Sequence, residues 1–333
     1  MRLVIVVSVL SAILLIGMVI FGFWMFDFAL VRKEQMDFDA GDDLLPHMDV
    51  IRFRSREAQN KIQNMPHEEV YIKSYDDLLL HATFVQSAYF SRKVVIAVHG
   101  YNSFGMFDMS SVVPFFRGMG YNVIIVDDRA HGKSEGKYIG FGFLDRLDVL
   151  NWCRYAIERF GRNCEILLHG VSMGAATVLM TCGESCLPEQ VRGVIADCPF
   201  AGAYEEFGYI MRSNYRVPGR PLLYFASMVC KLRAGYTFGQ ASTIRAVRNI
   251  RIPVLFIHGD NDTFVPPYMT MRMYKACRSR QKYIYICPEA THCYSAFQDM
   301  DTYVSHLSDF VYNIHHPIEN HYPQLKHSPS QLR

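Results

Sequence analysis

Short apolar runs alternate with longer amphipathic stretches over most of the chain. The run 94–98 is continuously apolar, which is typical of a strand buried on both faces of a parallel sheet. Residues 70–73 and 78–85 predict an opening hairpin, with Tyr75, Asp76 and Asp77 as its turn. This alternation indicates βαβ units, and therefore an α/β protein whose mostly parallel sheet carries helices on both faces. The further strands are expected at 94–98, 122–126, 165–168, 191–196, 254–257 and 283–286, and the helices at 109–119, 143–160, 173–183, 268–278 and 295–314.

One segment breaks this rhythm. Residues 201–250 separate two expected strands by far more chain than a βα connection needs, and they are rich in Tyr and Phe. We interpret them as a helical cap laid over the carboxyl edge of the sheet. Arginines and lysines outnumber the acidic pair Glu205 and Glu206 in this cap. The basic side chains either favour anionic substrates or lipid head groups, or form an ordinary solvated helical face.

The N-terminus carries the longest apolar stretch. Residues 3–26 contain no charge, and as a helix they would extend roughly 36 Å, enough to cross a hydrocarbon core of roughly 30 Å with some tilt. Phe21, Phe23, Trp24 and Phe26 cluster at one end, as aromatic residues do at membrane interfaces. A cleaved signal peptide is the alternative, but its apolar core is shorter and ends at small residues. The pattern favours an uncleaved single-pass anchor in the cell membrane.

These features divide the chain into an anchor at 1–26, a polar and partly helical connector at 27–68, and a main domain at 69–314. The tail at 315–333 is rich in His, Pro and polar residues, and is expected to be disordered. Basic residues flank the anchor on both sides, so the positive-inside rule assigns no side of the membrane to the main domain.

Composition narrows the possible partners. Lys and Arg number 34 and Asp and Glu 32, and this balance gives no reason to expect a nucleic-acid partner. The nine cysteines are odd in number and scattered, unlike a disulfide framework. Cys182 and Cys186 come nearest to a metal-binding pair, but they lack a second half, so no metal is expected.

The most specific motif is G-x-S-x-G at 170–174. It follows the expected strand 165–168 and opens the next helix, which is the context that this motif requires. Side chains at the two glycine positions would clash with a sharply turned backbone, so the pattern points to Ser172 as a nucleophile. The N–H of Met173, at the start of the helix, could then face a developing oxyanion. On this motif alone, a chance glycine-flanked turn is the alternative.

A serine nucleophile needs a base and an orienting acid, and this fold presents them in the order serine, acid, histidine. Asp262 follows the strand expected at 254–257, and His292 follows the one at 283–286. Both therefore lie at the carboxyl edge of the sheet together with Ser172. Asp260 and Asp197 are alternative acids. Cys293 suggests thiol chemistry, but Ser172 already occupies the turn.

At this point the sequence resembles the α/β-hydrolase superfamily over about residues 69–314. Within it, the chain is most similar to bacterial membrane-tethered hydrolases of the serine aminopeptidase and monoglyceride-lipase-like branch. The matching stretches are 99–102, 127–136, 170–174, 258–266 and His292.

The resemblance implies an α/β-hydrolase fold, with Asp262 as the acid and the backbone N–H of Tyr101 as the second oxyanion donor. It also implies structural roles for the loop 127–136, with Arg129 and His131 tying loops together. Ala130 departs from the family pattern, because glycine is commoner there. His99 is a possible base, but we expect it to hold its turn by hydrogen bonds.

The expected reaction is acyl transfer from a small-molecule substrate to Ser172 and then to water, with no cofactor. A carboxylic ester is the first candidate. A peptidase or amidase is the alternative, and its free-amine subsite would need acidic groups such as Glu205 and Glu206. A non-catalytic binder with this fold is a third possibility, although such proteins usually lack a member of the triad.

Overall fold

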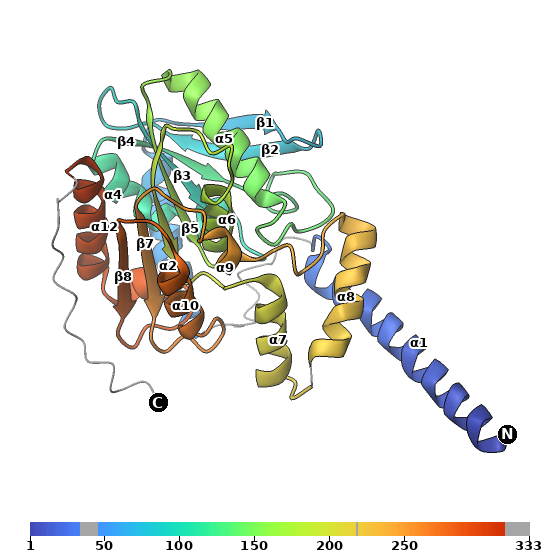
Figure 1. The fold of residues 1–333 in the computed structure, drawn as a ribbon. Coiled ribbons are helices and arrows are strands. Elements are labelled where there is room, and N and C mark those ends of the chain that lie inside the picture. Colours follow the sequence, from blue (N-terminus) through green and yellow to red (C-terminus); the bar gives the residue numbers. More distant parts are fainter. Residues whose placement is uncertain (34–45, 218, 317–333) are drawn as a thin grey trace.

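The computed structural model describes residues 1–33, 46–217 and 219–316, and its centre is one eight-stranded sheet (Figure 1). The strand order is β1-β2-β4-β3-β5-β6-β7-β8. β2 pairs antiparallel with β1 and β4, whereas all pairs from β4 to β8 are parallel. The expected mostly parallel sheet is therefore confirmed. The strands are β1 His67–Lys73, β2 Leu79–Val85, β3 Lys93–Val98, β4 Tyr121–Val126, β5 Glu165–Val171, β6 Val191–Asp197, β7 Val254–Gly259 and β8 Lys282–Cys287.

Helices cover both faces of this sheet (Figure 1). On the central strand β3, Val94 and Ile96 point into the larger core, which also contains residues of α5 and α6. Val95 and Ala97 point into the second core, together with residues of α2, α4 and α12. Burial on both faces explains why this strand is apolar at every position. The helices named here are α2 Met48–Gln63, α4 Val113–Gly118, α5 Asp145–Phe160, α6 Met173–Cys182 and α12 Met300–His315.

Two expected helices are broken into shorter ones. The stretch 109–119 falls across η1 Ser110–Val112 and α4, preceded by α3 Gly105–Asp108. Pro114 in the first turn of α4 lacks an N–H and favours a new helix start there. The stretch 295–314 divides into α11 Ser295–Gln298 and α12, because Asp299 accepts a hydrogen bond from the N–H of Thr302 and caps the second helix.

Among the described residues, the segment 201–250 contains three helices. It contains α7 Ala203–Ser213, α8 Gly219–Ala234 and the short α9 Thr243–Ala246. After it, β7 leads to α10 Tyr268–Ala276, and α7 lies beside this part of the domain in Figure 1. α8 stands further out, next to the N-terminal helix.

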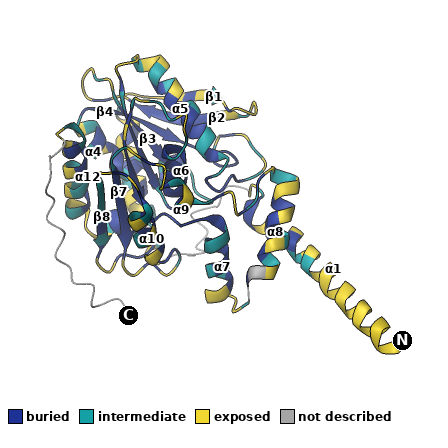
Figure 2. Ribbon diagram, viewed as in Figure 1, coloured by how far each residue is buried: buried dark blue, intermediate teal, exposed yellow. Residues whose placement is uncertain are grey.

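The N-terminal helix α1 runs from Arg2 to Leu30, past the boundary expected at residue 26. By length and composition it is the one helix of the described residues that could cross a membrane. Its first part projects away from the domain and is exposed (Figure 2). Its last turns are different, because Phe26 and Leu30 are completely buried in the larger core. Of the tail expected at 315–333, residues 317–333 lie outside the described residues.

Candidate active site

Ser172 occupies a sharp turn between a strand and a helix. β5 ends at Val171 and α6 begins at Met173, which leaves Ser172 alone between them with φ 52° and ψ −113°. A left-handed φ at a non-glycine residue costs about 1–3 kcal/mol and persists only where the surroundings enforce it. One enforcing contact is the hydrogen bond from the Ser172 N–H to the carbonyl of Asp197, at 2.8 Å.

The two flanking glycines allow this turn to pack. A Cβ on Gly170 would lie 2.3 Å from the carbonyl oxygen of Gly174. A Cβ on Gly174 would lie 2.2 Å from the carbonyl oxygen of Val98 and 2.4 Å from that of His99. Because these neighbours are backbone atoms of a buried strand and turn, they have little freedom to move.

Gly174→Ala is therefore expected to lower the free energy of unfolding by more than about 3 kcal/mol. Gly118→Ala is the matched control, because no atom lies within 4 Å of a Cβ built there. Thermal unfolding of the full chain in detergent, followed by circular dichroism, compares the two. Equal midpoints for the two variants would contradict the packing described here.

Three side chains from separate loops form one hydrogen-bonded chain. Ser172 Oγ lies 2.9 Å from His292 Nε2, and His292 Nδ1 lies 2.7 Å from Asp262 Oδ2. The three residues follow β5, β7 and β8, at the carboxyl edge of the sheet. All three are buried, with Ser172 only 6% exposed, so bulk water does not compete for these hydrogen bonds.

Asp262 sits in a cage of donors. Its Oδ1 accepts the N–H groups of Phe264 and Val265, at 2.9 and 2.8 Å, and His258 Nε2 lies 3.2 Å from its Oδ2. Burial alone would raise the pKa of Asp262, but the charge of His292 and the hydrogen bonds of His258 and His292 hold that pKa well below its usual range. The residue is therefore a carboxylate at neutral pH, as an orienting acid must be.

The contact between Asp262 and His292 also sets the protonation of His292. Burial lowers the pKa of His292, but the negative charge of Asp262 more than offsets it and holds that pKa well above the ordinary value.

A histidine acting as general base has to be neutral, so activity is expected to rise with pH through this raised pKa. The acid limb of kcat/KM for a soluble ester should then lie above about pH 6.5, the ordinary value for histidine. A profile between pH 5 and 10 measures it. A limb at or below that value would contradict a strong coupling between His292 and Asp262.

The alternative residues have other partners. Asp260 is exposed, and its Oδ1 accepts the N–H of Glu289 at 2.6 Å. Asp197 accepts the Ser172 N–H with its backbone carbonyl, and burial raises the pKa of its side chain to about 6. His99 Nδ1 hydrogen-bonds the Gly100 carbonyl at 2.7 Å, and its Nε2 accepts the N–H of Asp128 at 2.9 Å, so it holds its turn.

The turn after β3 lies directly against Ser172. A Cβ on Gly100 would be 3.4 Å from the Cβ of Ser172, so the neighbouring Tyr101 N–H belongs to the same small region. Asp108 fixes this turn by accepting the Gly100 N–H and the Ser103 hydroxyl, both at 2.7 Å. Sequence reasoning missed Asp108, because nothing local marks its position in the short helix α3.

The loop 127–136 forms a structural network. Arg129 pairs with Asp148 at 2.6 Å and with Asp76 at 3.0 Å. His131 Nε2 accepts the N–H of Asn102 at 3.2 Å, which ties the loop to the turn after β3. Ala130 has φ 62°, a conformation that glycine adopts most easily, and this is a physical reason for the glycine that the family resemblance leads us to expect there.

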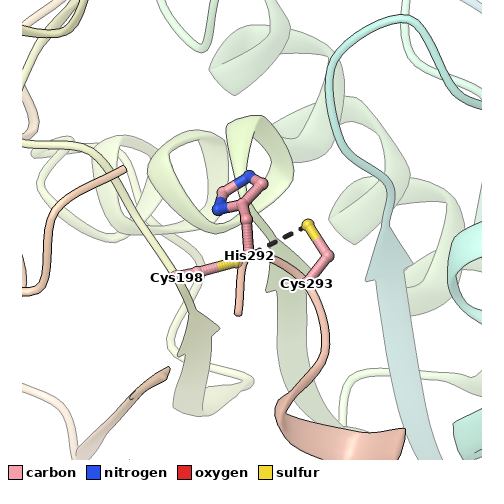
Figure 3. A group of neighbouring side chains, drawn as sticks. All are labelled: Cys198, His292 and Cys293. Carbon is pink, nitrogen blue, oxygen red and sulfur yellow. Dashed lines mark hydrogen bonds between the residues drawn. The ribbon is translucent and has the colours of Figure 1, made fainter. Parts of the chain in front are cut away.

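Two thiols lie beside His292, one directly after β6 and the other in the loop after β8. Figure 3 shows Cys198 and Cys293 on either side of the histidine stem. Their sulfurs are 3.7 Å apart. Ligand atoms of the three side chains lie within 4.8 Å of one another, a separation that a metal ion could bridge. However, both nitrogens of His292 are already hydrogen-bonded, to Ser172 and Asp262. A metal ion would have to displace one of these two hydrogen bonds. The surroundings of His292 therefore suit a proton acceptor better than a metal ligand.

Cys293→Ser is expected to keep activity within about threefold of the parent, because both hydrogen bonds of His292 are made by other residues. Ester turnover and thermal stability of the variant test this. A loss of turnover as large as that of Ser172→Ala, in a variant of normal stability, would mean that the thiol takes part in the chemistry.

Glu206 is an unexpected neighbour of the candidate triad. It lies on α7 and is 2% exposed, and neither of its carboxylate oxygens has a hydrogen-bond partner among the described residues. Burial raises its pKa to about 8, against the opposing charge of His292. The sequence analysis noted Glu205 and Glu206 as the acidic pair of the segment 201–250, but it did not predict that Glu206 turns inward.

Aromatic side chains close the space under the cap. Phe141 packs on Phe200 and Phe207, with ring centroids 4.7 and 4.6 Å apart, and Tyr101 lies 6.0 Å from Phe141. A cavity of about 460 Å³ opens between α7, α8 and residues 238–244, and no triad residue lines it. The aromatic rings therefore form an apolar cluster between the turn after β3 and α7.

The family comparison covers the part of the chain that holds these residues. A family model described as "Serine aminopeptidase, S33" matches residues 90–231 and 223–296. These matches include Tyr101, Ser172, Asp262 and His292 and stop short of the N-terminal helix.

Similar proteins occur in bacteria and yeast. YqkD of Bacillus subtilis is 33% identical over 68% of this chain and 73% of its own length. The membrane protein YNL320W of Saccharomyces cerevisiae is 24% identical over 71% of this chain and 77% of its own. Among solved structures, the esterase Pf2001 of Pyrococcus furiosus superposes with a TM-score of 0.62 at 23% identity, and covers 76% of this chain and 93% of the esterase. That likeness establishes a shared fold.

Proposed function

This chain belongs to the serine aminopeptidase S33 family of the α/β-hydrolase superfamily, and we propose that it is a membrane-anchored serine hydrolase that cleaves carboxylic esters. One observation carries the proposal. A serine in a strained strand-to-helix turn is hydrogen-bonded through a histidine to a buried carboxylate. An arrangement of this kind activates a hydroxyl group for acyl transfer.

In the proposed mechanism, His292 Nε2 accepts the proton of Ser172 while Oγ attacks the substrate carbonyl. The same nitrogen then donates that proton to the leaving alcohol, which departs and leaves an acyl-enzyme. Asp262 keeps the proton of the neutral imidazole on Nδ1 and stabilises the imidazolium that forms. Water then attacks the acyl-enzyme with the same help from His292 and releases the carboxylic acid product.

The tetrahedral intermediate carries a negative oxygen, and we propose that two backbone N–H groups bind it. Among the hydrogen bonds of the described residues, neither the Tyr101 N–H nor the Met173 N–H is a donor, so both are available. Met173 opens α6, where the helix dipole also favours negative charge.

The surroundings of Ser172 favour an apolar acyl group, because aromatic rings lie under the cap and the N-terminal helix is suited to an anchor. A panel of esters and amides with different acyl lengths, given to the full chain in detergent, tests this. We expect turnover of medium or long acyl esters, and none by Ser172→Ala. Turnover of amides alone would reject ester cleavage as the function.

Glu206 supports a second candidate, an amidase or peptidase for substrates with a free amine. A buried carboxyl without a partner is costly, and a cationic group would supply both charge and hydrogen bonds. Under this alternative, Glu206→Gln lowers kcat/KM for aminoacyl substrates at least about tenfold and leaves simple esters unchanged. Equal effects on both substrate classes would remove this alternative.

We further propose residues 1–26 as a single-pass anchor in the cell membrane. YNL320W, which is named a membrane protein, supports this by similarity, and the length of α1 supports it physically. Cleavage near residue 26 would also remove part of a helix whose end is buried in the domain core, so an uncleaved anchor fits better.

A further inference from the structure

The N-terminal helix does not end where it meets the domain, but continues along its surface. The side chains on one face of its last turns are buried, namely those of Met25, Phe26, Ala29 and Leu30. Gly22 marks the first close approach, because a Cβ there would lie 2.9 Å from the backbone carbon of Phe225 in α8. α1 and α8 are therefore packed backbone against backbone from Gly22 onward.

The part of α1 before this contact has about the length of a hydrocarbon core. The stretch from residue 3 to residue 21 is exposed except at Met18 and Phe21, which are half-buried. As a helix it measures roughly 28 Å, and a hydrocarbon core measures roughly 30 Å. If this part spans the bilayer, the helix leaves the hydrocarbon where α8 begins to accompany it (Figure 2).

Aromatic and charged side chains at this level fit a membrane–water interface. Trp24 stacks on Phe28 with ring centroids 5.4 Å apart, and the ammonium group of Lys33 lies over the ring of Phe28. Asp27 forms an ion pair with Arg233 of α8. Trp and Tyr gather at interfaces, and charges avoid the hydrocarbon, so the head-group region is expected at about this level.

α8 carries an apolar face that the protein leaves uncovered. Tyr224, Met228 and Leu232 are 58%, 49% and 78% exposed, and their spacing of four residues puts them on one side of the helix. Lys231 is exposed next to them. Inward-facing residues of the same helix, such as Leu223 and Ala226, belong to the larger core. A helix with one buried face, one exposed apolar face and a flanking cation is typical of interfacial helices.

We propose that α8 lies on the bilayer that α1 crosses, with Tyr224, Met228 and Leu232 inserted among the lipid head groups and the first acyl carbons. This proposal rests on the membrane anchoring proposed above. We expect lipid to cover this face, because the packing of α8 against α1 holds α8 at the level of the membrane interface. The cap that covers Ser172 then faces the bilayer, and the substrate class is an acyl ester dissolved in that bilayer.

Tryptophan quenching tests the position of α8 directly. The chain has two tryptophans, and Trp152 is buried in the domain, so only Trp24 can sense lipid. Met228→Trp is made in a Trp24→Phe background, and the protein is reconstituted in vesicles of brominated phosphatidylcholine. Tyr312→Trp in the same background is the matched control, because Tyr312 is similarly exposed but lies on α12, far from α1 in Figure 1.

We expect the bromine atoms to quench the indole of the Met228→Trp variant at least about twice as strongly as that of the Tyr312→Trp variant. Equal quenching of the two, with Trp24 of the parent quenched, would overturn the proposal, because α1 would be inserted and α8 in water. An unquenched Trp24 would overturn it too, together with the anchor.

A kinetic comparison tests the substrate class. The double variant Met228→Glu and Leu232→Glu is expected to hydrolyse an acyl ester embedded in vesicles at least about tenfold more slowly than the parent. Its turnover of a soluble short-chain ester should not change. Equal loss on both substrates, or loss on neither, would overturn the proposal. If the parent hydrolyses neither ester, the proposed esterase function fails, while the quenching result still decides where α8 lies.

Discussion

Replacement of His292 by alanine is expected to lower kcat for an ester substrate about 10⁶-fold. The reason is geometric, because His292 Nε2 is the group hydrogen-bonded to Ser172 Oγ in the described part of the chain. Without it, the attacking hydroxyl keeps its proton and the leaving group receives none. Some rate above that of water should remain, because the backbone donors and the bound substrate are untouched.

Steady-state turnover of a soluble ester by the detergent-solubilised chain measures this loss. His67→Ala is the control, because His67 is exposed at the start of β1 and should be dispensable. Retention of more than about 1% of parent kcat by His292→Ala would contradict its role as the base. Ser172→Ala should lose about as much as His292→Ala, and the double variant should lose little more, because the two residues act as one unit.

Replacement of Asp262 by asparagine is expected to lower kcat about 10⁴-fold. If the amide nitrogen faces His292, it cannot accept the Nδ1 proton. If the amide oxygen faces His292, it accepts that proton but has no negative charge to stabilise the imidazolium. The donors that now hold Asp262, the N–H groups of Phe264 and Val265, would still position an asparagine oxygen. The variant should therefore fold, and its loss should be one of chemistry.

Two further variants decide between the carboxylates. Asp260→Asn is expected to change kcat less than about threefold, because Asp260 is exposed and bonded to the N–H of Glu289. Asp197→Asn keeps the backbone carbonyl that holds Ser172 and should cost far less than Asp262→Asn. If either of these variants lost more activity than Asp262→Asn, the assignment of the acid would be wrong.

Much of the arrangement could be predicted because the fold brings distant residues together by a simple rule. In a parallel sheet, all carboxyl ends lie at one edge, and Ser172, Asp262 and His292 each follow a strand that its apolar pattern reveals. The glycines around Ser172 were informative for a similar reason, since a Cβ at either position meets backbone atoms. Local sequence patterns were therefore enough to predict those site residues whose positions are set by the ends of strands.

Features that depend on packing between distant segments could not be predicted in this way. Neither Glu206 nor Asp108 stands in a local pattern that shows it turning inward. The docking of α1 on α8 joins segments about 200 residues apart in the sequence, and an apolar run alone cannot tell lipid contact from burial in the domain. The helices expected at 109–119 and 295–314 are broken by Pro114 and by the capping residue Asp299. The apolar pattern runs across both breaks, so a prediction from that pattern gives one long helix in each case.

The central claim is that Ser172 is an activated nucleophile, and a fluorophosphonate probe tests it most directly. The full chain should be used, because the end of α1 is part of the domain core. We expect covalent labelling of the parent on Ser172, slower labelling of Asp262→Asn, and none of Ser172→Ala. A well-folded parent that does not react, or a Ser172→Ala variant that reacts like the parent, would contradict the claim.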